Sequence, residues 1–183
     1  MASTRLRGFP PVIDRHCRTL ILGSFPSQAS LMKAQYYGHP QNQFWKLLEQ
    51  VLDAPLFDMP YRERLKTLLA HRIGLWDVIG GCERAGSLDS AIRNATNNRF
   101  RRVARVAAGL RRVCFNGKTA GRLEPLFAEQ GYETRVLPSS SPANTMSFPT
   151  KLRWWRKALA RNEGQVRRVT GLRSPIAGHA RSC

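Results

Sequence analysis

Acidic residues are scarce in this sequence: 12 Asp and Glu stand against 30 Lys and Arg among 183 residues, which gives a formal net charge of +18. Residues 164–183 hold four of the basic residues and no acidic residue, so the remainder, with 26 basic and 12 acidic residues, still carries +14. A field of this sign attracts polyanions, and nucleic acid is the commonest polyanionic partner. A solubilising surface or an acidic protein partner is the alternative explanation of the charge.

The sequence also lacks the patterns of several other protein classes. Its four cysteines include no Cys-x-x-Cys pair and have no histidine at zinc spacing, so we expect no metal and no cofactor. No secretory segment opens the chain, and no apolar run approaches the ~20 residues of a membrane span, so we expect no membrane contact. These absences predict an intracellular, cytoplasmic protein with reduced thiols. Because of the positive charge, we also expect it to associate through DNA with a bacterial nucleoid.

Short apolar runs alternate with helical patterns along the chain. We expect strands over residues 19–23, 74–79, 112–116 and 133–137, and helices over residues 44–52, 61–71, 99–110, 119–130 and 150–161. This alternation predicts an α/β fold, a three-layer α/β/α domain with a central, mostly parallel four-stranded sheet. We expect one domain over residues 1–163, acting as a monomer, followed by a basic, disordered tail over residues 164–183.

Polar segments follow three of the predicted strands, at residues 24–42, 116–119 and 139–145. In open α/β sheets the ligand crevice lies at the carboxyl ends of the strands, so we expect these segments to meet there. Two of them carry notable runs, which are Gly23-Ser24-Phe25-Pro26 followed by Gly38-His39-Pro40-Gln41-Asn42-Gln43-Phe44-Trp45, and Ser139-Ser140-Ser141-Pro142-Ala143-Asn144.

These runs resemble motifs of the uracil-DNA glycosylase superfamily. A strand ending in Gly-x-x-Pro and followed by Gly-His-Pro-x-Asn-x-Phe-Trp is similar to the first motif of its mismatch-specific branch, and the Ser-Pro-Ala-Asn run resembles the second motif. Gly74-Leu75-Trp76-Asp77-Val78-Ile79 and Phe115-Asn116-Gly117-Lys118 complete a pattern similar to the hypoxanthine-DNA glycosylases. The resemblance covers roughly residues 17–160 and implies a glycosylase that extrudes a damaged base from double-stranded, and also single-stranded, DNA.

One position departs from the mismatch-specific motif. Those enzymes carry an Asn in Gly-x-Asn-Pro that positions the attacking water, whereas this chain has Phe25 there. The resemblance implies that Asn42 takes this catalytic role, although Asn42 is also well placed to cap the following helix. His39 is the second catalytic candidate, either stabilising anionic charge or contacting phosphate, or it simply orders the turn before Pro40.

The remaining candidates are residues for base and DNA binding. Asn116 is our candidate base reader, because an Asn amide can pair with the lactam edge shared by hypoxanthine and uracil; a turn Asn before Gly117 is the alternative. The other substrate-binding candidates are Gly23, Ser24, Phe25, Tyr37 and Phe44. The DNA-binding candidates are Ser139, Ser140, Ser141, Pro142, Asn144 and Lys118, with a structural turn as the alternative for the serine-rich loop. We interpret Asp77 as a turn residue that could orient pocket groups, and Trp154 and Trp155 as packing residues.

Together these features predict a monofunctional glycosylase of base excision repair acting first on deoxyinosine, because no Lys in the candidate loops is poised as a Schiff-base nucleophile. A uracil-preferring glycosylase is the nearest alternative, and a non-catalytic, glycosylase-like DNA-binding module is the alternative from another class.

Overall fold

The centre of the protein, for which a computed structural model describes residues 5–160, is a four-stranded parallel sheet. Its strands in spatial order are β3 (Ile73–Asp77), β2 (Thr19–Gly23), β6 (Arg112–Asn116) and β7 (Glu133–Leu137). Every neighbouring pair is parallel, so all four carboxyl ends lie at one edge of the sheet. The predicted fold class is thereby confirmed, and its sheet is parallel throughout.

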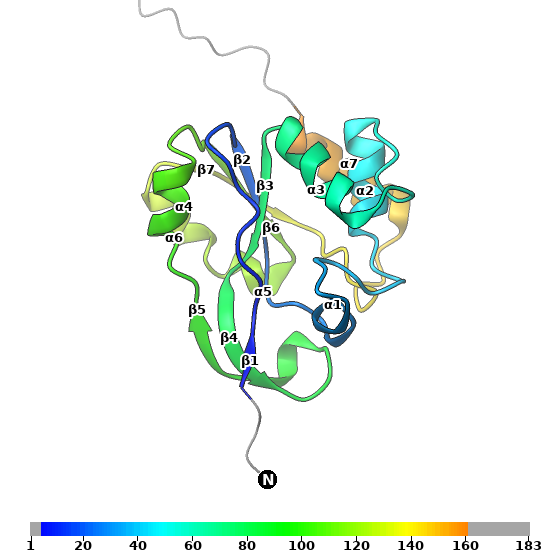
Figure 1. Ribbon diagram of the computed structural model, residues 1–183, viewed down its shortest axis with the longest axis vertical. Coiled ribbons are helices and arrows are strands. Elements are labelled where there is room, and N and C mark those ends of the chain that lie inside the picture. The colour runs from blue at the N-terminus through cyan, green and yellow to red at the C-terminus, as the bar shows by residue number, and fades with distance from the viewer. Residues whose placement is uncertain (1–4, 161–183) are drawn as a thin grey trace, which may run out of the picture.

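Helices cover both faces of this sheet. Figure 1 shows three helices on one side, which are α2 (Phe44–Leu52), α3 (Tyr61–Ala70) and α7 (Phe148–Leu159). On the other side lie α4 (Arg101–Val106) and α6 (Glu124–Glu129). Because both faces are covered, β2 and β3 are buried along nearly their whole length and show no alternation of buried and exposed residues.

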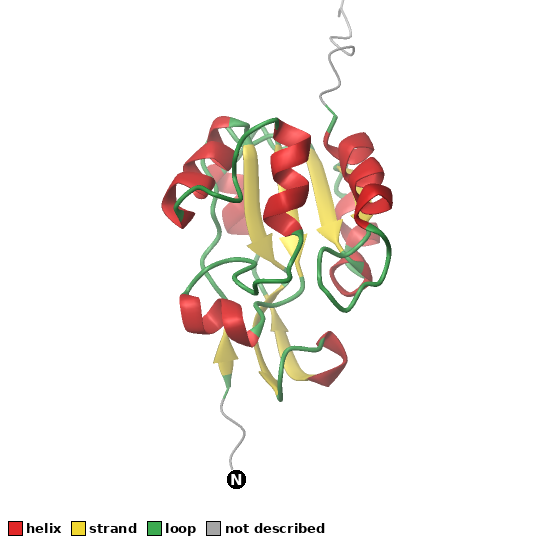
Figure 2. Cartoon of the chain, turned by 90° about the vertical axis from the view of Figure 1, so that its right-hand side faces the viewer, coloured by secondary structure: helices red, strands yellow, loops and turns green. Residues whose placement is uncertain are grey.

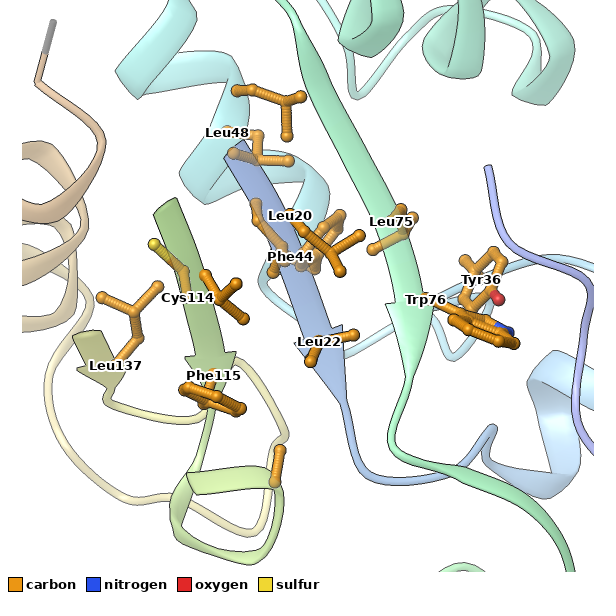
Figure 3. Packing of buried hydrophobic residues seen from close by; sticks show 14 of the residues in the cluster. Leu20, Leu22, Tyr36, Phe44, Leu48, Leu75, Trp76, Cys114, Phe115 and Leu137 are labelled. Atoms are coloured by element: carbon orange, nitrogen blue, oxygen red, sulfur yellow. The ribbon is translucent and has the colours of Figure 1, made fainter. Parts of the chain in front are cut away.

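The core lies between the sheet and these helices. Leu20, Leu22, Leu75 and Phe115 project from the strands into the core, and Phe44 and Leu48 of α2 belong to the same cluster of buried side chains (Figure 3). Trp155 of α7 is fully buried and donates from its indole nitrogen to the carbonyl oxygen of Pro138 at 3.0 Å, so it is a packing residue as predicted.

A second, three-stranded antiparallel sheet lies below the first in Figure 2 and is absent from the sequence-based prediction. It contains β1 (Leu6–Arg7), β4 (Ile79–Arg84) and β5 (Ile92–Asn97), with the short 3-10 helix η1 (Asp89–Ala91) between the last two. The predicted strand 74–79 is therefore two elements, since β3 ends at Asp77 and β4 continues into the smaller sheet. Gly80 and Gly81, which follow the predicted strand, lie within β4, and a Cβ on Gly80 would lie 2.5 Å from Oδ1 of Asn98.

Two predicted helices are shorter or divided. The helix expected over residues 99–110 is limited to α4, and the helix expected over residues 119–130 is two helices, α5 (Lys118–Gly121) and α6. Pro125 stands in the first turn of α6, a position that proline tolerates, whereas it would break a continuous helix.

The predicted tail over residues 164–183 lies outside the described residues, and the predicted domain of residues 1–163 exceeds them by a few residues at each end. Among the helices that are described, none has the length and apolar character needed to cross a membrane.

Candidate active site

A cavity of about 720 Å³ opens at the carboxyl edge of the parallel sheet. Each of the four strands contributes its last residue to the lining, namely Gly23, Asp77, Asn116 and Leu137. The predicted crevice at this edge is therefore present, and it is large enough to hold a nucleobase with its sugar.

The three polar segments predicted to meet do line this cavity together. Among the candidate residues, those in the lining are Gly23, Ser24, Phe25, Tyr37, Asn42, Asn116, Lys118, Ser139, Ser140, Ser141 and Asn144. Three candidates, His39, Phe44 and Pro142, do not line it. The helix α1 (Gln28–Lys33), capped by the Ser27 hydroxyl at 3.1 Å from the Ser30 amide, lies within the first of these segments.

Asn42 lies in the cavity lining, one residue before Gln43, which is the N-cap of α2. Its Oδ1 accepts a hydrogen bond from the amide of Phe44, the first residue of α2, at 3.0 Å. This bond uses one lone pair of Oδ1 and leaves the second lone pair and both N–H groups of the amide without a partner among residues 5–160. An amide held by this bond has a defined orientation, which is what a group that holds a water molecule needs.

Asn116 is held firmly at the end of β6. It is 8% exposed, and its amide makes two hydrogen bonds to Ser140: Nδ2 donates to the Ser140 hydroxyl and Oδ1 accepts from the Ser140 amide, both at 2.8 Å. One N–H and one lone pair of the amide make no further hydrogen bond of good geometry among the described residues, although the amide interacts with the nearby Tyr37 hydroxyl and acts to lower its pKa. The side chain is thus more than a turn residue, because it joins β6 to the serine-rich loop across the cavity lining.

Ser140 also ties this loop to the first motif. It is fully buried, and its carbonyl oxygen accepts from the amide of Gln43 at 3.0 Å. Ser140 thereby holds Asn116 in place from within the cavity lining, and a contact of its hydroxyl with a DNA phosphate stays a prediction. Ser139 and Ser141 accept hydrogen bonds from amides within the loop, Ser141 N and Ala143 N respectively.

Lys151, on α7, is a further link that the sequence did not indicate. Its side chain is 1% exposed, and its Nζ donates to Oε1 of Gln43 at 2.9 Å and to the carbonyl oxygen of Asn144 at 2.8 Å. Burial lowers the pKa of this amine. Lys151 thereby links the segment that contains Gln43 to the serine-rich loop that contains Asn144.

Aromatic side chains form one wall and its support. Phe25 lines the cavity, and the guanidinium carbon of Arg84 lies 5.1 Å from the centre of its ring, a cation–π arrangement. Tyr37 stacks on Phe44 with ring centres 3.7 Å apart and an angle of 14° between the planes. Phe44 is fully buried, so it supports Tyr37 and does not itself face an extruded base. Trp154, expected to pack in the core, is 52% exposed at the rim of the cavity.

His39 orders the turn before Pro40. Its Nδ1 accepts from the amide of Gln41 at 3.2 Å, and its carbonyl oxygen accepts from the amide of Asn42 at 3.0 Å. The residue therefore fixes the segment that carries Asn42, and any direct chemical role of its imidazole stays a prediction.

Asp77 is the feature that sequence reasoning undervalued. It is 3% exposed at the end of β3 and pairs in register with Gly23, where any side chain would collide with its carboxyl oxygen Oδ1 and would lie 2.8 Å from the Tyr37 hydroxyl. Burial, and then the negative charge of Asp89, raise the pKa of Asp77 to about 8, against a lowering effect of Arg84. A buried carboxylic acid at a strand end is visible only once burial and register are known.

No three His, Cys, Asp or Glu side chains within residues 5–160 lie close enough together to hold a metal ion. The chemistry of the cavity comes instead from amides, hydroxyls and one buried carboxyl group.

Known proteins are similar to this chain in sequence and in fold. The family model described as Uracil DNA glycosylase superfamily matches residues 10–163. A protein of Methanosarcina acetivorans named Hypoxanthine DNA glycosylase is 51% identical over 138 residues, which are 75% of this chain and 87% of that protein. One of Methanosarcina barkeri with the same name is 43% identical over 155 residues, 85% of this chain and 98% of that protein. A solution NMR structure of a candidate uracil DNA glycosylase from M. acetivorans superposes with a TM-score of 0.78 at 46% identity, covering 85% of this chain and 97% of the other.

Proposed function

This chain belongs to the uracil-DNA glycosylase superfamily, and on that basis we propose that it is a monofunctional DNA glycosylase of base excision repair that removes hypoxanthine from deoxyinosine in DNA. The observation that carries the proposal is a single cavity lined by Asn42, Asn116 and the serine-rich loop. The names of the two Methanosarcina relatives support hypoxanthine as the first substrate.

The reaction itself explains why amides are the useful groups. Cleavage of an N-glycosidic bond passes through a positively charged, oxocarbenium-like sugar and a departing base anion, so the enzyme must extrude the nucleotide, place a water molecule at C1′ and stabilise the base. Asn42, with its orientation fixed by the hydrogen bond from the Phe44 amide, has a lone pair free to accept a hydrogen bond from this water.

Asn116 is the proposed reader of the base. Its remaining N–H and lone pair match the carbonyl and N–H of a lactam edge, which hypoxanthine presents and adenine does not. A site that leaves a buried polar group unpaired with the wrong base discriminates strongly, so the rigid hold of Ser140 on Asn116 favours selectivity for deaminated bases.

The DNA backbone would be held by the positive charge of the chain and by groups around the cavity mouth. Lys118 is exposed and lines the cavity, and Ser139, Ser141 and Asn144 belong to the loop beside it. Exposed apolar side chains at the same mouth, Met146 and Trp154, suit contacts with bases and sugars of an opened duplex. We propose that the protein acts as a monomer on double-stranded DNA and also on single strands.

A pair of substitutions at Asn42 tests the mechanism. Asn42→Ala removes both the hydrogen bond from the Phe44 amide and the proposed water contact, and we expect excision of hypoxanthine to fall roughly 10²- to 10³-fold while DNA binding changes little. Asn42→Ser is the matched control, because a serine oxygen can still accept the hydrogen bond from the Phe44 amide but does not extend an amide into the cavity. Restored activity in the serine variant would show that only this hydrogen bond matters and would remove Asn42 from the chemistry.

Two alternative functions stay open to experiment. A uracil-preferring glycosylase is favoured by the structural neighbour described as a candidate uracil DNA glycosylase, and disfavoured by Phe25 in place of the motif Asn. A non-catalytic DNA-binding module would bind a duplex containing inosine and release no base. Strand cleavage without alkali treatment would contradict the monofunctional assignment, and borohydride trapping would then point to Lys118, the lysine of the cavity lining.

A further inference from the structure

Two buried polar atoms in the cavity lining have no hydrogen-bond partner among the described residues. They are Oδ2 of Asp77 and the hydroxyl oxygen of Tyr37, and both residues line the cavity. Buried polar groups are almost always paired, and those that are not require an explanation. An unpaired carboxyl group and an unpaired hydroxyl group in one cavity lining indicate that a ligand supplies the missing partner.

The backbone is shaped to keep these two groups together. Gly23 leaves open the space in which they meet, because a Cβ there would collide with Oδ1 of Asp77 and lie 2.8 Å from the Tyr37 hydroxyl. Tyr37 itself has a φ of 54°, in the left-handed region that a bulky residue rarely adopts, and its ring is fixed by stacking on Phe44. Such strain persists where the surrounding structure over-determines it, and it clusters at functional sites.

On the premise of the proposed function, we infer that Asp77, which lies beside the Tyr37 hydroxyl, is the proton donor to the departing purine, at its N7 atom, while Asn116 reads the lactam edge. A purine leaves with the electron pair of its bond to C1′, and this charge is spread over the imidazole ring. A proton at N7 neutralises it. Uracil has no imidazole ring, so this donor acts on purines alone.

The atoms balance as in a simple hydrolysis. The N9–C1′ bond breaks and its electron pair stays on the purine, while the proton of the Asp77 carboxyl group moves to N7. The oxygen of water bonds to C1′, and the proton that this water releases restores the carboxyl group through solvent. The products are neutral hypoxanthine and an abasic sugar, with no other reactant.

The groups around Asp77 keep its proton in place at neutral pH. Burial and the negative charge of Asp89, on η1, raise the pKa of Asp77 to about 8, and Arg84, on β4, lowers it in part. The tyrosine hydroxyls that interact with Asp77 are uncharged, because burial raises the pKa of each; they are Tyr36, Tyr37 and Tyr61. The neighbouring strand β2 offers only Gly23 at this position, so the proton stays on Asp77 until the solution becomes alkaline.

A substrate lacking N7 isolates this step. In 7-deazadeoxyinosine a C–H group replaces N7, while the lactam edge and the ring size are kept. Single-turnover excision of both substrates should be compared in wild type and in Asp77→Asn, which keeps the shape of the side chain but has no acidic proton. We expect Asp77→Asn to lose roughly 10²- to 10⁴-fold on deoxyinosine, the usual contribution of a general acid, and no more than about threefold on the deaza substrate. If Asp77→Asn slowed excision of both substrates equally, Asp77 would only maintain the shape of the cavity, and the inference would be overturned.

The pH dependence gives a second readout that needs no variant. Wild-type excision of deoxyinosine should fall about tenfold per pH unit above the pKa of Asp77, whereas excision of the deaza substrate should stay level over that range. Asp89→Asn should move the falling limb to lower pH, and Arg84→Gln should move it to higher pH, because their charges act on Asp77 in opposite directions. Glu63→Gln, on the exposed face of α3, is the matched control and should leave the profile unchanged.

Tyr37→Phe tests whether the Tyr37 hydroxyl contributes to proton donation by Asp77. The ring still stacks on Phe44, so the fold is kept, and we expect a smaller loss on deoxyinosine than in Asp77→Asn, with the pH limb retained. If wild type releases no base from an inosine duplex, the proposed function and this inference both fail. If wild type excises hypoxanthine but shows the same pH profile on both substrates, only this inference fails.

Discussion

Asp77→Asn should make the protein more stable at neutral pH even as it removes activity. The folded state holds this carboxyl group where its pKa is about 8, whereas the unfolded chain gives it the ordinary value of 3.8. Between these two values the unfolded state has lost the proton that the folded state still binds, so the free energy of unfolding falls as pH rises through this window. An asparagine has no titrating proton, so the free energy of unfolding of the variant does not fall with pH for this reason.

The magnitude follows from the width of the window. Each pH unit costs about 1.4 kcal/mol, so wild type at pH 7 has lost up to about 4 kcal/mol relative to pH 4, a large fraction of the stability of a typical domain. The penalty reaches its limit near the folded-state pKa and is constant above it. Functional sites commonly carry a cost of this kind, because a group held in an unfavourable environment is what the chemistry needs.

Urea denaturation of both proteins at several pH values between 5 and 8 measures this effect. The difference in unfolding free energy between Asp77→Asn and wild type should widen steadily with pH in favour of the variant. In Asp89→Asn the free energy of unfolding should change less with pH than in wild type, because the substitution removes a negative charge that raises the pKa of Asp77. A difference that is the same at every pH would refute the buried, protonated carboxyl group.

Three further predictions concern the rest of the site. Lys151→Met should cost about 1–3 kcal/mol of stability, because Gln43 Oε1 and the Asn144 carbonyl oxygen lose their hydrogen-bond donor. The same substitution should speed hydrogen exchange of the backbone amides in residues 139–146, and unchanged exchange would argue against the proposed link between the two segments. Gly23→Ala should destabilise the fold by about 1–3 kcal/mol and abolish most excision, because its Cβ would occupy the space between Asp77 and Tyr37. Full activity of this variant would contradict the close approach of these two side chains to Gly23. DNA affinity should fall at least ~10²-fold between 50 and 200 mM salt as counterion release requires, and a flat response would refute the role of the positive charge.

The sequence predicted the elements whose pattern is strong. The strands β2 and β3 are buried, mainly apolar runs of five residues, and α2 has apolar residues at helical spacing, so these elements were found. The small antiparallel sheet was missed because β1 has only two residues and β5 is a polar, mostly exposed segment, Ile92–Asn97, with no apolar alternation to read. Its stability comes from pairing with β4, which is a tertiary contact.

The site was predicted in outline but not in its connections. The rule that parallel strands end at one edge correctly brought the three polar segments together. It could not show that Ser140 is enclosed by Asn116 and Gln43, or that Phe44 lies behind Tyr37, because burial depends on which side of a loop faces the core. Asp77 looked like a turn residue because it follows an apolar run, and only its register with Gly23 places its carboxyl group in the cavity lining.

Base release from defined duplexes tests the central proposal most directly. Duplexes that each carry one inosine, one uracil or only normal bases would be incubated with excess protein, and the freed base would be quantified alongside strand cleavage before and after alkali. The account predicts free hypoxanthine, released faster than uracil, with strand cleavage only after alkali. Binding of the inosine duplex without release of any base would contradict it.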